Sequence, residues 1–157
     1  MLTDPLLKDL PTNDLLQSEL FGEFSRRLLQ EGRSIRFRAC GASMSPAIRD
    51  GEIVHIGPAA PADLCPGDIV LVKNAGRLLL HRLVKADADQ DVFITRGDCG
   101  QDDDPALEGA QILGLAQAKL VRIGPRLIHA RFKGPMGRAL RCAARVQYAA
   151  GKLLKGR

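Results

Sequence analysis

From Ser34 to Ile123 the sequence is a succession of short apolar segments separated by turns that contain Gly or Pro. Apolar and polar residues alternate in most of these segments, as in a β-strand with one buried face, and the others are short continuous apolar runs. The segments cover residues 35–40, 53–56, 69–73, 77–86, 91–96 and 112–123. Because no helical pattern separates them, we predict a mainly β fold, a barrel-like domain of at least six short strands.

The composition agrees with one turn-rich β domain. Of the 157 residues, 16 are Gly and 9 are Pro, whereas aromatic residues make up only 4%. A chain of this length can bury one core of useful size, and nothing in the sequence indicates a second globular domain. We place the β domain at residues 33–124, after a helical segment at 1–32 and before a basic helical tail at 125–157.

The N-terminal segment has the pattern of an amphipathic helix. Thr12-Asn13 can cap a helix that runs to about Glu31, where Gly32 can end it. Apolar residues recur every four positions along one face: Leu16, Leu20, Phe24 and Leu28. We expect this helix to pack across the β domain or on a partner; a degenerate anchor or an arm that faces the substrate is the alternative.

Charge is distributed unevenly along the chain. Residues 1–32 and 33–118 each have a net charge of −3, and residues 119–157 have no acidic group and a net charge of +11, which gives the overall +5. From Gly134-Pro135 onward the basic residues share an amphipathic helical pattern with an alanine-rich apolar face. Weak, salt-sensitive contact with an anionic membrane surface is one expected use of this tail. Packing on the β domain and binding to a nucleic acid or an acidic protein remain open.

Several functional classes are disfavoured. The sequence has no apolar run of about 18 residues and no secretory signal pattern, so we expect a cytoplasmic protein, peripheral to a membrane at most. The four cysteines (Cys40, Cys65, Cys99 and Cys142) lack the spacing of a metal site or of a disulfide framework, so no metal or cofactor is expected. Nucleic acid is disfavoured as a partner, because 30 N-terminal residues are too few for a helix-turn-helix domain.

Three segments supply side chains suited to nucleophilic catalysis. Ser43 lies in the turn Gly41-Ala42-Ser43-Met44-Ser45-Pro46, followed by His81-Arg82 and then by Arg96-Gly97-Asp98. A serine hydroxyl needs a base within hydrogen-bond reach, and an imidazole base needs a group that fixes its tautomer. The order serine, histidine, aspartate proves nothing by itself, so the residues that flank these three matter more.

Taken with the turns Asp50-Gly51-Glu52 and Pro66-Gly67-Asp68, and with Asp102-Asp103-Asp104, these motifs resemble the signal peptidase I superfamily, which includes self-cleaving repressors. The resemblance covers about residues 35–115. It implies a serine peptidase fold with Ser43 as nucleophile. His81 stands where many members have a lysine base, which places the resemblance in the histidine branch that is typified by the endoplasmic-reticulum enzyme.

The resemblance also implies that two aspartates matter, Asp98 in the Gly-Asp motif and Asp104 six residues later. We expect Asp104 to orient His81 and Asp98 to shape the loop. Lys85, on the same strand as His81, is the alternative base. The backbone N–H of Ser43 should form part of the oxyanion hole, and the second donor is not identified by the sequence.

These residues predict a serine endopeptidase that cleaves a peptide or protein substrate, bound in an extended conformation, through an acyl-enzyme on Ser43. By resemblance, small residues are expected just before the cleaved bond. Two alternatives keep the same fold: a catalytically silent peptide-binding module and a self-cleaving regulatory switch. The switch is disfavoured because its cleavage bond would have to be Cys40-Gly41, which is too close to Ser43 to fold back onto it.

Overall fold

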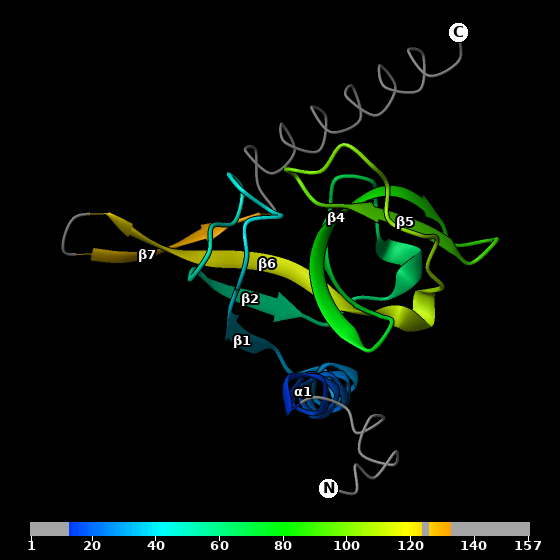
Figure 1. Ribbon diagram of the computed structural model, residues 1–157, viewed down its shortest axis with the longest axis horizontal. Coiled ribbons are helices and arrows are strands. Elements are labelled where there is room, and N and C mark those ends of the chain that lie inside the picture. The colour runs from blue at the N-terminus through cyan, green and yellow to red at the C-terminus, as the bar shows by residue number, and fades with distance from the viewer. Residues whose placement is uncertain (1–12, 124–125, 133–157) are drawn as a thin grey trace, which may run out of the picture.

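The computed structural model describes residues 13–123 and 126–132, drawn in colour in Figure 1. Within these two ranges, one helix precedes seven strands, and two short 3-10 turns interrupt the strand succession. The elements in chain order are α1 (Asn13–Gln30), β1 (Ile35–Arg38), β2 (Ile53–Gly57), η2 (Pro61–Asp63), β3 (Ile69–Asn74), β4 (Arg77–Asp87), β5 (Val92–Arg96), η3 (Gly109–Gln111), β6 (Ile112–Ile123) and β7 (Arg126–Arg131).

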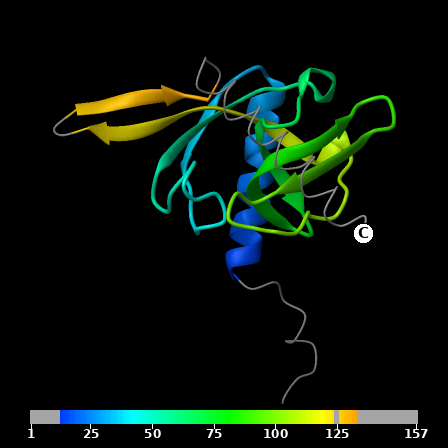
Figure 2. The same cartoon turned by 90° about the horizontal axis from the view of Figure 1, so that it is seen from above.

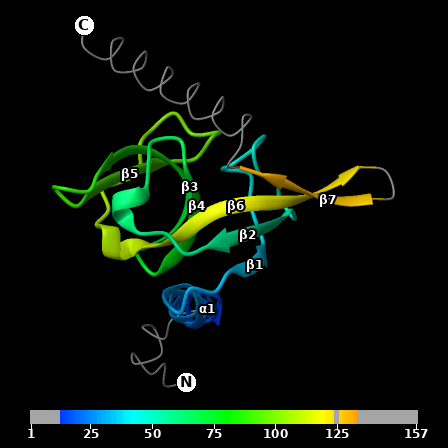
Figure 3. The same cartoon turned by 180° about the vertical axis from the view of Figure 1, so that it is seen from behind.

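All seven strands belong to one antiparallel sheet with the order β1-β2-β6-β3-β4-β5, and β7 pairs with β6 outside this path. The 12-residue strand β6 joins two parts of the sheet. Its first residues pair with β3, and its later residues pair with β2 on one side and β7 on the other. Figures 1 and 3 show the β6–β7 hairpin as an arm that projects beyond the rest of the sheet.

The predicted mainly β fold is confirmed, and the sheet contains a strand at each of the six predicted positions. The expected barrel-like closure is wrong: β1 and β5 end the pairing order, and the sheet is not closed. Strand β7 is a second difference, since residues 126–131 were expected to begin the helical tail. Alternation predicts strands one by one, whereas closure depends on pairing between distant segments, which a local pattern does not contain.

The predicted N-terminal helix is confirmed as α1, although its expected cap, Thr12, lies outside the described residues. The helix ends where the sequence indicates, because Gly32 adopts a φ of 76° and its N–H donates to the Leu29 carbonyl. Among the residues that the structure describes, no helix has both the length and the apolarity needed to cross a bilayer. The proposed helix from Gly134 lies outside the described residues.

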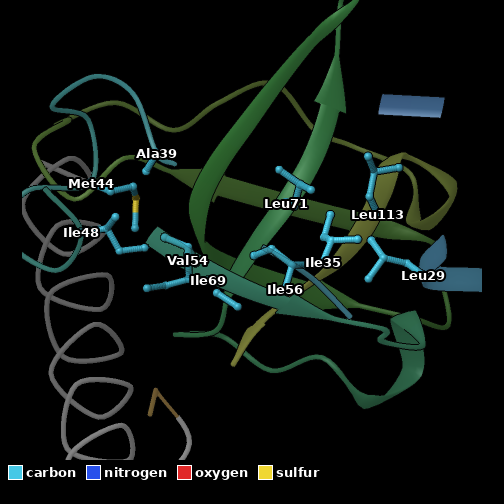
Figure 4. Close-up of a cluster of buried hydrophobic side chains, with 11 residues drawn as sticks. Leu29, Ile35, Ala39, Met44, Ile48, Val54, Ile56, Ile69, Leu71 and Leu113 are labelled. Carbon is cyan, nitrogen blue, oxygen red and sulfur yellow. The ribbon is translucent and has the colours of Figure 1, made fainter. Parts of the chain in front are cut away.

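The core consists of two clusters of buried side chains, one on each side of β3. Ile69 and Leu71 belong to the first cluster, and Val70 and Val72 belong to the second. This explains why β3 reads as a continuous apolar run rather than as an alternation. In the first cluster (Figure 4), Leu29 of α1 lies near Leu113 at one end. Helix α1 thus packs across the sheet, as the view from above shows (Figure 2).

Candidate active site

The segment after β1 presents Ser43 at the surface on a firmly held turn. Gly41 begins the turn with a φ of 90°, a conformation that residues with a Cβ rarely adopt. Met44 and Ile48 are 4% and 1% exposed and anchor the segment in the first core cluster, where Figure 4 shows them side by side. Ser43 itself is exposed. The sequence thus combines an accessible hydroxyl with two apolar anchors directly after it.

Hydrogen bonds tie together the two ends of this turn. The Ala39 N–H donates to the Glu52 carbonyl at 2.8 Å, and the Gly51 N–H donates back to Ala39 at the same distance. The Gly41 N–H donates to Oδ1 of Asp50 at 2.8 Å. These bonds explain the role of the Asp50-Gly51-Glu52 motif, which closes the loop that holds the serine.

His81 projects from β4 between a hydroxyl and a carboxylate. Its Nε2 lies 3.2 Å from the Ser43 Oγ, and its Nδ1 lies 2.6 Å from Oδ2 of Asp104. The same Oδ2 accepts a hydrogen bond from the hydroxyl of Thr95, a fully buried residue of β5, at 2.7 Å. The N–H of Asp104 donates to the Thr95 carbonyl at 2.8 Å. Thr95 therefore fixes both the backbone and the carboxylate of Asp104.

The other expected aspartate, Asp98, contacts a different partner. Both of its carboxylate oxygens accept hydrogen bonds at 2.7 Å from the guanidinium of Arg82. Arg82 is 8% exposed, and its Nη1 also donates to the Gly67 carbonyl at 2.8 Å. Such a bidentate pair fixes geometry as well as charge. Arg82 thus connects the turn Pro66-Gly67-Asp68 to the loop at residues 97–108, between β5 and η3, which contains Asp98 and Asp104 and is called the acidic loop below.

The acidic loop packs closely on the serine turn. A Cβ on Gly97 would lie 2.9 Å from the Ser43 carbonyl oxygen and 3.3 Å from the His81 Nε2, so only glycine fits without displacement. The N–H of Cys99 donates to the same Ser43 carbonyl at 2.9 Å, and its thiol contacts the Ser45 carbonyl at 3.1 Å. This close contact fixes the position of Ser43 relative to His81.

The structure brings Ser43, His81 and Asp104 into one hydrogen-bonded line. Asp98 is not part of this line and is instead bound to Arg82, the neighbour of His81 in the chain. The alternative base is placed elsewhere: the Lys85 ammonium lies 4.0 Å from Asp87, and a register shift follows Leu83 in β4. Asp103, the neighbour of Asp104 in the chain, forms an ion pair with Arg96.

The Ser43 N–H, the expected oxyanion donor, donates no hydrogen bond within the described part of the chain. The Gly41 N–H is not available for the same purpose, because it already donates to Asp50. A preorganised donor of this kind stabilises the charge that develops on an attacked carbonyl oxygen.

Sequence reasoning missed three residues of the site: Thr95, Gly97 and Cys99. Gly97 was part of a recognised motif, and a glycine beside two candidate site residues indicates a close backbone approach. Thr95 and Cys99 gave no comparable indication. Their contacts join residues far apart in the chain, and a threonine in a strand is most often explained by strand propensity alone.

The site contains no obvious place for a metal. Within residues 13–123 and 126–132, no three His, Cys, Asp or Glu side chains are grouped closely enough to bind one. Comparison with known proteins does not assign the chain to a family. No family model matches the chain, and no curated protein matches it.

Proposed function

We propose that the chain is a serine endopeptidase of the signal peptidase-like type, with Ser43 as nucleophile, His81 as general base and Asp104 as the orienting carboxylate. The observation that carries this proposal is the continuous line from the Ser43 Oγ to the His81 Nε2 at 3.2 Å and from the His81 Nδ1 to Asp104 at 2.6 Å. A base candidate must be within reach of the proton that it removes, and His81 meets this requirement.

The proposed reaction has two halves. Ser43 Oγ forms a bond with the substrate carbonyl carbon while its proton passes to the His81 Nε2, and the oxygen of the tetrahedral intermediate takes the negative charge near the Ser43 N–H. His81 then gives its proton to the leaving amine as the C–N bond breaks. Water then attacks the ester carbonyl carbon while its proton passes to the His81 Nε2. As the C–Oγ bond breaks, His81 gives this proton to the Ser43 Oγ and the acid product leaves. Asp104 keeps the proton of neutral His81 on Nδ1 and stabilises the imidazolium.

The proposed place in the histidine branch of the family is supported by the contacts between the sequence motifs. Arg82 joins Gly67 to Asp98, and Gly97 packs between Ser43 and His81. Motifs that are spread from Ser43 to Asp98 in the sequence therefore converge on one site. This convergence favours the proposed family more strongly than the motif order does, because each motif has a contact that explains its residue types.

Two free strand edges near Ser43 support an extended peptide substrate. Strand β1 pairs only with β2, and the Arg77–His81 half of β4 pairs only with β3 among the described residues, since β5 begins its pairing at Arg82. Free edges offer backbone donors and acceptors to an added strand. A peptide bound there would pass directly beside the serine.

The proposal is tested by acylation of Ser43. The full-length protein is treated with a small fluorophosphonate, and intact mass and peptide mapping locate the adduct. We expect one adduct on Ser43, none on Ser43→Ala, and a much slower reaction for His81→Ala, because the hydroxyl then lacks its base. A second measurement tests peptide-bond cleavage itself. Wild type should cleave a mixture of unstructured proteins, and Ser43→Ala should not. Absence of any adduct on folded wild type would overturn the proposal.

A further inference from the structure

A pocket of about 240 Å³ opens directly beside the candidate nucleophile. Ser43 and Met44 of the serine turn form one part of its wall, and Leu78 and Leu80 of β4 form another. Phe37 of β1 and Phe21 of α1 also line it, as does the charged Arg38 of β1. Most of the residues that line the pocket are therefore apolar, and Ser43 is one of the lining residues.

The size of this pocket exceeds that needed for a small side chain. A dry cavity of about 150 Å³ lined by Leu, Ile and Phe holds a benzene molecule. A pocket of about 240 Å³ therefore has room for a leucine, methionine or phenylalanine side chain. Burying such a side chain is worth about 1.5–3 kcal/mol, which alanine cannot supply.

Helix α1 contributes a wall of this pocket through Phe21. The Phe21 ring meets Phe37 edge to face, with ring centroids 6.0 Å apart. Gly22, the next residue, faces Leu78 of β4, and Leu29 anchors the same helix in the core. One turn farther along, Phe24 is 61% exposed and does not line the pocket. Phe21 is thus placed for substrate contact, and Phe24 is not.

We propose that this pocket selects substrates with a bulky apolar side chain, such as Leu, Met or Phe, on the acyl side of the cleaved bond, and that Phe21 determines this specificity. The inference rests on the proposed function, because it assumes attack by Ser43. It departs from the small-residue preference that the family resemblance implies. The helix that was expected to pack on the domain thereby becomes part of the substrate site.

The test uses p-nitrophenyl esters, whose acyl groups report on the pocket without a known peptide sequence. The kcat/KM values for acetate and 4-methylpentanoate are measured with the full-length protein, after subtraction of the Ser43→Ala background. We expect wild type to prefer 4-methylpentanoate by about tenfold or more, since each methylene in an apolar pocket adds discrimination. Phe21→Trp should reduce this preference severalfold by filling the pocket, without a matching loss on acetate. Phe21→Ala should also lower it, by removing a wall.

Phe24→Ala is the matched control, because it removes an aromatic ring from the same helix outside the pocket, and it should keep the wild-type ratio. Fluorophosphonate labelling of each variant separates the two proposals. If Ser43 is labelled but the ester ratio is near one, or does not change in either Phe21 variant, the specificity inference is wrong. If wild-type Ser43 is not labelled at all, the proposed function fails, and the specificity inference fails with it.

Discussion

Two histidines of this sheet lie in opposite electrostatic surroundings. His81 on β4 has a carboxylate on one ring nitrogen and a serine hydroxyl on the other. His55 on β2 instead meets His129 of β7 edge to face, with ring centroids 4.6 Å apart, and lies opposite Arg36 of β1. Its Nε2 is buried without a hydrogen-bond partner among the described residues.

The surroundings act on the charge of each ring. Burial lowers the pKa of His55, and the positive charges of Arg36 and His129 lower the pKa further. His55 therefore stays neutral and has no group to activate. The Asp104 carboxylate, in contrast, can stabilise an imidazolium at His81 during a reaction. The comparison shows that the contacts of a histidine, and not its position on a strand, make it a candidate base.

The largest expected effect is on kcat/KM when one of the two histidines is replaced. His81→Ala should lower kcat/KM by about 10⁴-fold or more, because the members of such a unit act together. His55→Ala should leave kcat/KM within about twofold of wild type. Both values are measured with the ester substrate or with a peptide substrate. Similar losses in the two variants would contradict the division of roles between these histidines.

A second prediction concerns the close approach of the acidic loop to the turn that holds Ser43. Gly97→Ala should lower kcat/KM by about 100-fold, since the added Cβ would lie 2.9 Å from the Ser43 carbonyl oxygen and a shift of about 1 Å has an effect of this size. Gly22→Ala is the control, because its Cβ would make only an ordinary contact of 3.4 Å with Leu78. Full activity of Gly97→Ala would show that this approach does not set the geometry.

A third, smaller effect is expected at Thr95, which acts on His81 through Asp104. Thr95→Val keeps the shape of the buried side chain but removes the hydrogen bond to Asp104, and kcat/KM should fall by about tenfold. Thr95→Ser restores a hydroxyl and should recover most of the activity. Thermal unfolding of both variants identifies any loss that comes from instability. If valine and serine gave the same activity, the hydroxyl would have no positioning role.

The smallest effect concerns stability at the His55 pair. Because the folded-state pKa of His55 lies below its ordinary value of 6.5, the unfolded chain binds more protons as the pH falls through that value. Wild type should therefore lose stability on acidification from pH 7.5 to 5.0. His55→Gln should lose less over the same interval, with His129→Gln in between, as measured by urea unfolding at both pH values. An equal loss in wild type and His55→Gln would contradict this linkage.

Much of the candidate site can be predicted from the sequence, but its contacts cannot. The sequence singles out Ser43, His81, Asp98 and Asp104, and the structure places three of these in one line. The family resemblance already favoured Asp104 over Asp98 as the partner of His81, and the structure adds the reason, because Arg82 binds the Asp98 carboxylate. Thr95 and Cys99 were missed because their partners lie 9 and 54 residues away.

For the fold, too, some features follow from the local sequence and others depend on the tertiary structure. The alternation and the apolar runs determined six strands, and helical spacing with Gly32 determined α1, because these patterns depend on neighbouring residues. The tertiary structure alone decided that β6 serves three partners, that the sheet stays open between β1 and β5, and that Phe21 of α1 lies at the pocket of Ser43. These features arise from packing between distant segments, and its geometry depends on the whole core at once.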